Sequence, residues 1–183
     1  MTTKAIAALC FSFLLLVTGC NTMKTPLKTV QYVNIDKFMG TWYVIASIPT
    51  FVERSAYNPV EHYALTKDGT IATTFRYQKN NANGKPREIT ATGFITNTLT
   101  NAEWGMQFIW PVKADYRIIM LDANYEITMV GRAKRDYLWI MSRNHCIHKD
   151  KLRELLKFAK QVGYDTSKIK LSSWQQETPA KAC

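Results

Sequence analysis

The side chains best suited to metal chemistry in this chain are His145, Cys146 and His148, which fall within four consecutive positions. Imidazole and thiolate groups are the ligands that zinc prefers in proteins, and both also bind haem iron. The sequence offers no second cluster of such residues, and one short turn cannot surround a metal ion. We therefore predict a surface turn here, no metal site and no cofactor.

Motifs for nucleophilic catalysis and phosphate binding are missing from the sequence. It contains no Gly-x-Ser-x-Gly, His-Glu-x-x-His, Cys-x-x-Cys or Gly-x-Gly-x-x-Gly pattern. The remaining candidate for acid–base chemistry is Glu61, which would need a buried position to act. We predict that the protein is not an enzyme, and a lipid- or isoprenoid-modifying enzyme that uses Glu61 is the alternative.

The first twenty residues have the features of a secretory signal. Lys4 precedes an apolar run from Ala5 to Val17, which is too short to cross a membrane. The following Thr18-Gly19-Cys20 resembles the bacterial lipoprotein signal, in which cleavage precedes the cysteine and the cysteine receives lipid, including acyl chains such as palmitate. We expect lipidation of Cys20, and an ordinary signal peptide is the alternative. Asn21, by the same resemblance, favours the outer membrane over the inner one.

The length and the charge of the chain predict a single domain with a basic surface. The chain has 183 residues and a formal net charge of +10, and loss of residues 1–19 removes one lysine to leave +9. The basic residues are scattered, so we predict no nucleic-acid partner. They become denser only along a predicted late helix, at Lys149, Lys151, Arg153, Lys157 and Lys160. That face is either simply solvated or attracted to anionic lipid head groups.

Two cysteines remain once residues 1–19 are removed and Cys20 is lipidated. Cys146 and Cys183 would share an oxidising compartment, where thiols tend to pair. We predict a disulfide between them, and a reduced pair is the alternative.

Short β-rich segments joined by tight turns fill the middle of the chain. Asp68-Gly69 and the loop around Asn83-Gly84 are hairpin signals. We predict eight strands, over residues 42–48, 60–65, 70–78, 88–96, 104–110, 116–121, 125–132 and 137–143. Even spacing of this kind favours an all-β, antiparallel up-and-down barrel over a sandwich.

The period of the apolar residues changes after the last predicted strand. Leu152, Leu155, Leu156, Ala159 and Val162 recur at helical spacing and end at Gly163. A helix with one apolar stripe should pack on the outside of the barrel. A further extended segment over residues 168–173 could add a ninth strand to the barrel. The chain is therefore expected to divide into a signal at residues 1–19, a flexible tether at 20–29, a barrel with one helix at 30–173 and a tail at 174–183.

The pattern Gly40-Thr41-Trp42-Tyr43, with Arg143 at the end of the last strand, resembles the lipocalins. Within that family the similarity is to bacterial lipocalins, which are outer-membrane lipoproteins, and to apolipoprotein D. A third family motif stands here as Ala114-Asp115-Tyr116, without its usual threonine. The resemblance implies a structural role for Gly40, Trp42, Asp115, Tyr116 and Arg143, with the Arg143 guanidinium on the Trp42 indole at the closed end.

The resemblance also implies a cavity for an apolar ligand. Matching Tyr63-Ala64-Leu65 and Leu138-Trp139-Ile140 with apolipoprotein D carries lining residues onto Tyr63 and Trp139, and the same match adds Phe75 and Tyr116. Strand alternation adds Val44, Ala46, Phe108, Ile118 and Met141. Arg54, near the open end, is either a head-group ligand or a solvated charge. The alternative for the aromatic residues is that they simply fill the barrel.

These inferences lead to one predicted function. We expect a lipid-anchored outer-membrane lipocalin, facing the periplasm, that stores or carries an amphiphilic lipid such as a lysophospholipid or fatty acid. An envelope-structural lipoprotein with a filled barrel is the main alternative. The sequence leaves open the ligand's identity, the choice between transport and storage, and whether the chain forms a homodimer.

Overall fold

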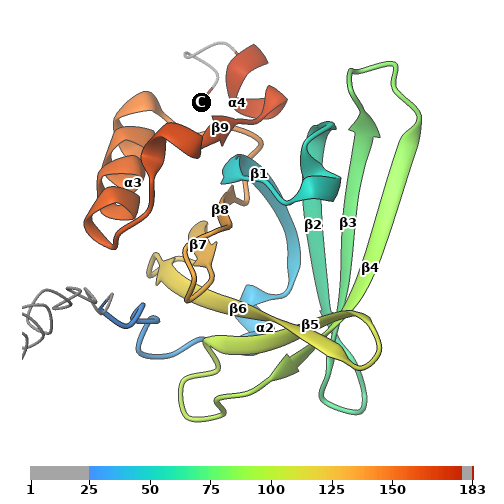
Figure 1. Ribbon diagram of the computed structural model, residues 1–183, viewed down its shortest axis with the longest axis vertical. Helices are drawn as coiled ribbons and strands as arrows, with labels where there is room; N and C mark the ends of the chain where they lie inside the picture. Colours follow the sequence, from blue (N-terminus) through green and yellow to red (C-terminus); the bar gives the residue numbers. More distant parts are fainter. Residues whose placement is uncertain (1–24, 179–182) are drawn as a thin grey trace, which may run out of the picture.

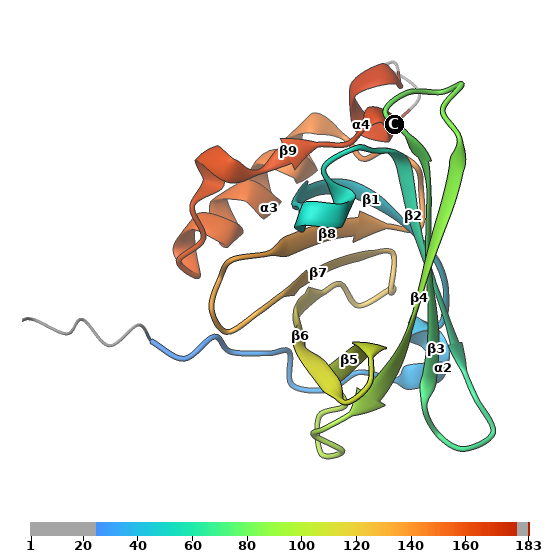
Figure 2. The same ribbon diagram turned by 45° about the vertical axis from the view of Figure 1, so that its right-hand side comes forward.

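The computed structural model describes residues 25–178 and Cys183 (Figures 1 and 2). The expected signal and Cys20 lie outside the described residues. Within them, no helix is long and apolar enough to span a bilayer.

Antiparallel strands wrap into a closed barrel, as the sequence predicted. The sheet order is β2-β3-β4-β5-β6-β7-β8-β1-β9, and pairing of β1 with β2 closes it. The bounds are β1 Gly40–Ile48, β2 Ala56–Leu65, β3 Ile71–Lys79, β4 Pro86–Ile95, β5 Glu103–Ile109, β6 Val112–Leu121, β7 Ile127–Gly131, β8 Leu138–Ser142 and β9 Lys170–Leu171. Each pair from β2 to β8 is formed by neighbours in sequence, so the topology is up-and-down.

Alternation along the strands separates the inside of the barrel from the outside. In β3, Ile71, Thr73 and Phe75 are buried whereas Ala72 and Arg76 are exposed. Successive side chains of a strand point to opposite faces, so one face of β3 lines the interior.

The short helix α2 (Ile35–Phe38) closes one end of the barrel. Asn34 caps it, its side chain accepting a hydrogen bond from the Lys37 amide at 3.1 Å. Phe38 is fully buried and lies 5.1 Å from the Trp42 ring and 5.5 Å from the Trp104 ring, measured between centroids. The interior at this end is therefore filled by aromatic side chains.

The long helix α3 (Lys149–Gln161) packs on the outside of the barrel, as predicted (Figure 1). Leu152, Leu155 and Ala159 form its buried stripe and belong to a second core with Ile45 and Ile140. This outer core is separate from the core inside the barrel. The basic residues singled out along this segment are exposed.

The prediction that Ala46 faces the interior is wrong. The register of β1 against β8 shifts between Val44 and Ala46, which is a β-bulge. A bulge inserts one residue, so the side-chain alternation inverts beyond it. Val44 therefore packs inside the barrel, whereas Ala46 is buried in the outer core.

The chain after α3 returns to the first strand. The 3-10 helix η2 (Thr166–Lys168) leads to β9, which pairs with β1 at Ala46 and Ser47. Helix α4 (Ser173–Glu177), absent from the sequence prediction, follows β9. Cys146 and Cys183 are joined by a disulfide in the structure, with Cα atoms 5.5 Å apart, so the chain end lies beside the end of the barrel.

The segment before the barrel is attached to it. Leu27 is buried in the outer core, and the Thr25 carbonyl accepts a hydrogen bond from the Arg135 guanidinium. The tether expected over residues 20–29 is thus held against the barrel before residue 29.

Candidate functional site

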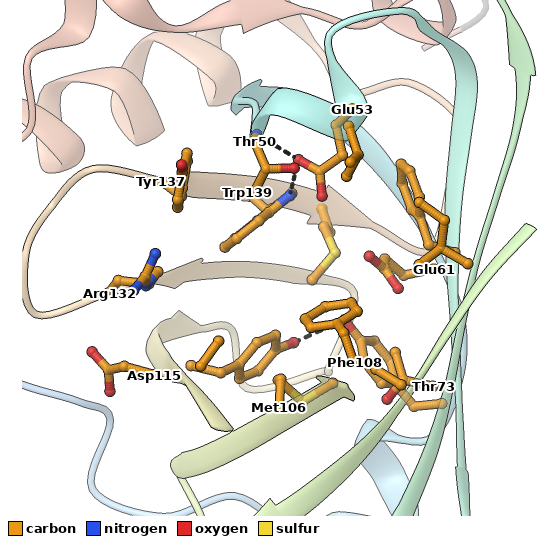
Figure 3. A pocket seen from close by; sticks show the side chains of 18 residues that line it. Thr50, Glu53, Glu61, Thr73, Met106, Phe108, Asp115, Arg132, Tyr137 and Trp139 are labelled. Carbon is orange, nitrogen blue, oxygen red and sulfur yellow. Dashed lines mark hydrogen bonds between the residues drawn. The ribbon is translucent and has the colours of Figure 1, made fainter. Parts of the chain in front are cut away.

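The barrel encloses a cavity of about 300 Å³, within the usual range for ligand pockets (Figure 3). Most of its wall is aromatic or aliphatic, and a few polar groups point into it. The lining residues are Thr50, Val52, Glu53, Glu61, Tyr63, Thr73, Phe75, Ile89, Ala91, Met106, Phe108, Ala114, Asp115, Tyr116, Arg132, Tyr137, Trp139 and Met141.

Most of the side chains predicted to meet a ligand share this cavity. The structure brings Tyr63, Phe75, Tyr116, Trp139, Phe108 and Met141 to its wall. Val44 and Ile118 are buried inside the barrel but are not part of the lining. Arg54 lies beside a smaller depression of about 120 Å³, which shares Glu53, Phe75 and Trp139 with the main cavity.

Two tyrosines form the deep part of the cavity. The Tyr63 and Tyr116 hydroxyls are 2.8 Å apart and hydrogen-bonded, and Tyr116 stacks on Trp104 with centroids 5.0 Å apart. Burial raises the pKa of both tyrosines, so both hydroxyls stay neutral. This pair holds its two hydroxyls in a fixed place below the open part of the cavity.

Glu53 lies between the mouth and the cavity, at the end of the 3-10 helix η1 (Phe51–Glu53). Its carboxylate accepts hydrogen bonds from the Thr50 amide at 2.8 Å and from the Trp139 indole N–H at 3.3 Å. Burial raises the pKa of Glu53, and these hydrogen bonds act in the opposite direction. Glu53 therefore orients Trp139, one of the predicted ligand contacts.

Glu61 is one of three cavity residues, with Thr50 and Arg132, that have a buried polar side-chain atom without a hydrogen-bond partner among the described residues. It lies on β2, one inward-facing position from Tyr63, and Figure 3 shows its carboxyl pointing into the cavity. Its buried Oε2 has no hydrogen-bond partner among the described residues. Loss of hydration, followed by the charge of Glu53, raises the pKa of Glu61 well above its ordinary value.

The remaining charged groups of the cavity are paired with charges outside it. Arg132 donates to Asp136 at 3.2 Å, and its guanidinium lies 5.2 Å from the Tyr137 ring centroid. Asp115 accepts from Arg117 at 2.9 Å and from the Ala133 amide at 2.7 Å. Asp115 thus fixes the loop after β7, which accounts for its structural role.

Exposed apolar side chains surround the entrance. Phe108, in the cavity wall, begins a run at the β5–β6 hairpin that continues through Ile109 and Trp110, and Trp110 is 82% exposed. Phe51, beside the cavity residue Val52, is 79% exposed. Exposed apolar side chains beside a cavity suit contact with an apolar partner or ligand.

The predicted arginine–tryptophan contact is present at the closed end. The Arg143 guanidinium lies 3.8 Å from the Trp42 ring centroid. It also donates to the carbonyls of Lys37, Met39 and Thr41 at 2.7–2.8 Å. Gly40 has a φ of +94°, and a Cβ there would lie 3.3 Å from Arg143. These contacts connect α2, β1 and the end of β8.

A family model described as a lipocalin-like domain matches residues 33–173, most of the chain. The chain belongs to the lipocalin family. The outer membrane lipoprotein Blc of Escherichia coli K12 is 30% identical to it over 156 residues, which cover 84% of this lipocalin and 88% of the relative.

Other relatives of this lipocalin come from eukaryotes. Temperature-induced lipocalin-1 of Arabidopsis thaliana is 29% identical over 170 residues, covering 88% and 89% of the two chains. Apolipoprotein D of Macaca fascicularis is 28% identical over 116 residues, or 60% of each chain. Insecticyanin from the tobacco hornworm Manduca sexta superposes with a TM-score of 0.62 at 16% identity, covering 81% and 84% of the chains, which shows the shared fold.

The histidine–cysteine cluster of this lipocalin is occupied by structural contacts. Cys146 is in the disulfide, the His148 side chain caps α3, and the His145 ring lies 6.2 Å from Tyr43 and 6.0 Å from Trp174, between centroids. Among residues 25–178 and 183, no three or more metal-binding side chains gather at one place.

Sequence reasoning missed several polar residues of the cavity. Glu53 had a detectable signal, because Thr50 and Glu53 have the spacing of a capping box. Arg132 and Tyr137 flank a loop between strands, and no short-range pattern shows that such a loop bends over a cavity.

Proposed function

We propose that this lipocalin binds an amphiphilic lipid, of the lysophospholipid or fatty acid class, inside its barrel. The observation that supports it is the cavity of about 300 Å³ with a largely apolar wall and polar groups at both ends. Burial of an acyl chain contributes about 25 cal/mol per Å² of apolar surface removed from water. The lipocalin family and its relatives support a binding or transport protein over an enzyme.

We further propose that lipid on Cys20 holds the protein at the outer membrane, with the barrel in the periplasm. The support is the lipoprotein-like end of the signal together with the relatives named outer membrane lipoprotein. An anchor raises the effective concentration of the barrel near membrane lipids without new contacts. The exposed apolar rim around the entrance is consistent with uptake from a lipid surface.

A tryptophan-fluorescence titration tests lipid binding. The chain with Cys20→Ala, freed of lipid, is titrated with lysophospholipid and with fatty acid. We expect saturable quenching at micromolar lipid, reduced in Trp139→Phe because Trp139 lines the cavity. Trp174→Phe is the matched control, since Trp174 packs on Tyr43 and is not part of the cavity wall. Absence of any response to either lipid would reject the proposal.

A further inference from the structure

One group inside the cavity is not explained by a purely apolar ligand. The Glu61 carboxyl faces the cavity, and its Oε2 is buried without a hydrogen-bond partner among the described residues (Figure 3). A buried carboxyl without a partner is costly, and an apolar side chain of similar shape would avoid that cost. An acyl chain alone would leave the oxygen as it is. A ligand that brings a hydrogen-bond donor would compensate the ionised carboxylate.

A second carboxyl faces the same space. Glu53 lies above Glu61 in Figure 3, and its charge acts on Glu61. Neither glutamate has an ion-pair partner within the described part of the chain, whereas Arg132 pairs with Asp136 and Asp115 with Arg117. The cavity therefore holds two carboxyls whose mutual repulsion and lost hydration a single cation would relieve.

The surroundings of Glu61 also suit a cation. Phe75 is the register partner of Glu61 on β3, and it lines the cavity together with Tyr63 and Trp139. Aromatic faces attract cations, most strongly where water is excluded. An ammonium group has three donors and no acceptor, so it can engage the free Oε2 and a tyrosine hydroxyl oxygen together.

We propose that Glu61 makes the cavity selective for amphiphiles that carry an ammonium group, over alcohols and carboxylates of the same chain length. The inference rests on the proposed binding function and specifies its ligand class. Among the lipids of the proposed function, fatty acids are expected to bind most weakly, because a carboxylate brings no hydrogen-bond donor to the free Oε2 of Glu61 and is repelled by the charge of Glu53.

A matched series of twelve-carbon ligands tests the selectivity. Dodecylamine, dodecanol and dodecanoate are titrated by tryptophan fluorescence at pH 7, below their aggregation concentrations, into the Cys20→Ala chain. A charge-assisted hydrogen bond is stronger than a neutral one. We therefore expect the amine to bind about tenfold more tightly than the alcohol. Glu61→Gln, which keeps the shape, should reduce that preference to within about threefold.

The control is Glu88→Gln, which makes the same change of charge on the exposed face of β4. Glu88 pairs with Arg76 outside the cavity, so the preference should stay at its original value. A preference that falls equally in both variants would mean general attraction of the ligand to the protein, and would overturn the role of Glu61.

The pH dependence is a second readout. The groups that face the cavity with Glu61 are Glu53, Tyr63, Asp115, Tyr116, Arg132 and Tyr137. An ammonium ligand favours ionised Glu61, so its binding releases a proton and its affinity should rise by up to about tenfold per pH unit while Glu61 is protonated. In Glu61→Gln the dependence should become shallower, because the group with the raised pKa is no longer there to titrate.

The outcomes separate this inference from the proposed function. If dodecanol binds but the amine shows no advantage, or the advantage survives in Glu61→Gln, the inference is wrong and lipid binding stands. If none of the three ligands binds, both are rejected. Amine preference that is lost in Glu61→Gln and kept in Glu88→Gln supports both.

Discussion

At the scale of single residues, Arg143 does more than cover an indole. Its guanidinium meets the Trp42 ring and donates to four backbone carbonyls between Lys37 and Thr41, so one side chain satisfies acceptors from α2 and β1. Removal of the side chain takes this donor from all of them, and the bonds to the Phe38 and Met39 carbonyls are partly buried.

Arg143→Ala should therefore destabilise the barrel strongly. We expect a loss of about 2–4 kcal/mol in the free energy of unfolding and a melting temperature lower by roughly 4–12 °C. Arg76→Ala is the control, because its exposed pair with Glu88 is worth less than about 1 kcal/mol. Thermal denaturation followed by circular dichroism measures both, and unchanged melting of Arg143→Ala would contradict the assigned role.

Glu61 should leave a signature in the pH dependence of stability. Its pKa is raised in the folded protein above the ordinary value of 4.5, so the folded state binds more protons than the unfolded state above that pH. The contribution of Glu61 to the free energy of unfolding is therefore fully present at low pH. It is lost as the pH rises from about 4.5 through the pKa of Glu61 in the folded protein.

Glu61→Gln removes that loss, so its stability relative to the wild type should grow as pH rises above about 4.5. The slope should approach 1.4 kcal/mol per pH unit while Glu61 is protonated in the folded state. Urea denaturation of the two proteins between pH 4 and pH 8 gives the difference directly. Parallel stability curves would mean that Glu61 titrates normally.

At the scale of elements, local periodicity in the sequence predicted the regular strands and the long helix, but not the features that depend on distant residues. The eight strands and α3 follow from alternation, turn residues and helical spacing, all of which are short-range properties. Ala46 was assigned to the wrong face because the bulge in β1 arises from pairing with β8, almost a hundred residues away. Helix α4 has only five residues, and the ring contact between Trp174 and Tyr43 connects it to β1. Long-range contacts of this kind leave no periodic signal in the sequence.

The junction between β7 and the segment after α3 provides a test of packing between elements. The Tyr164 hydroxyl accepts from the Arg132 amide at 3.0 Å and lies over Gly131, where a Cβ would meet it at 2.0 Å. Gly131→Ala should cost about 1–3 kcal/mol of stability, because Tyr164 must move and lose this hydrogen bond.

A double-mutant cycle identifies the cause. In a Tyr164→Phe background the clashing hydroxyl is gone, so Gly131→Ala should cost clearly less than in the wild type. Equal costs in the two backgrounds, measured by urea denaturation, would assign the effect to the backbone of β7 instead.

At the scale of the whole molecule, the barrel is attached to its N-terminal segment at a defined point. Leu27 is buried in the outer core between the barrel and α3, so the chain is attached to the barrel well before the first strand. From Cys20 to Leu27 there are about seven residues, which reach at most roughly 25 Å. If Cys20 carries lipid, the barrel is therefore confined to a thin layer beside the membrane, where its net charge of +9 without residues 1–19 is attracted to anionic head groups.

This confinement makes the length of the anchor a functional quantity. Insertion of twenty Gly/Ser residues between Lys24 and Thr25 extends the segment from about seven to about twenty-seven residues, and the effective concentration at the membrane should fall roughly eightfold, as the −3/2 power of length. We expect the initial rate at which the lipidated protein takes up a fluorescent lysophospholipid from its own vesicle to fall by a similar factor. The same insertion after Cys183 leaves the anchor unchanged and should leave the rate unchanged. Equal rates for the short and long anchors would mean that the lipid only retains the protein in the envelope, and that ligand reaches the cavity through the aqueous phase.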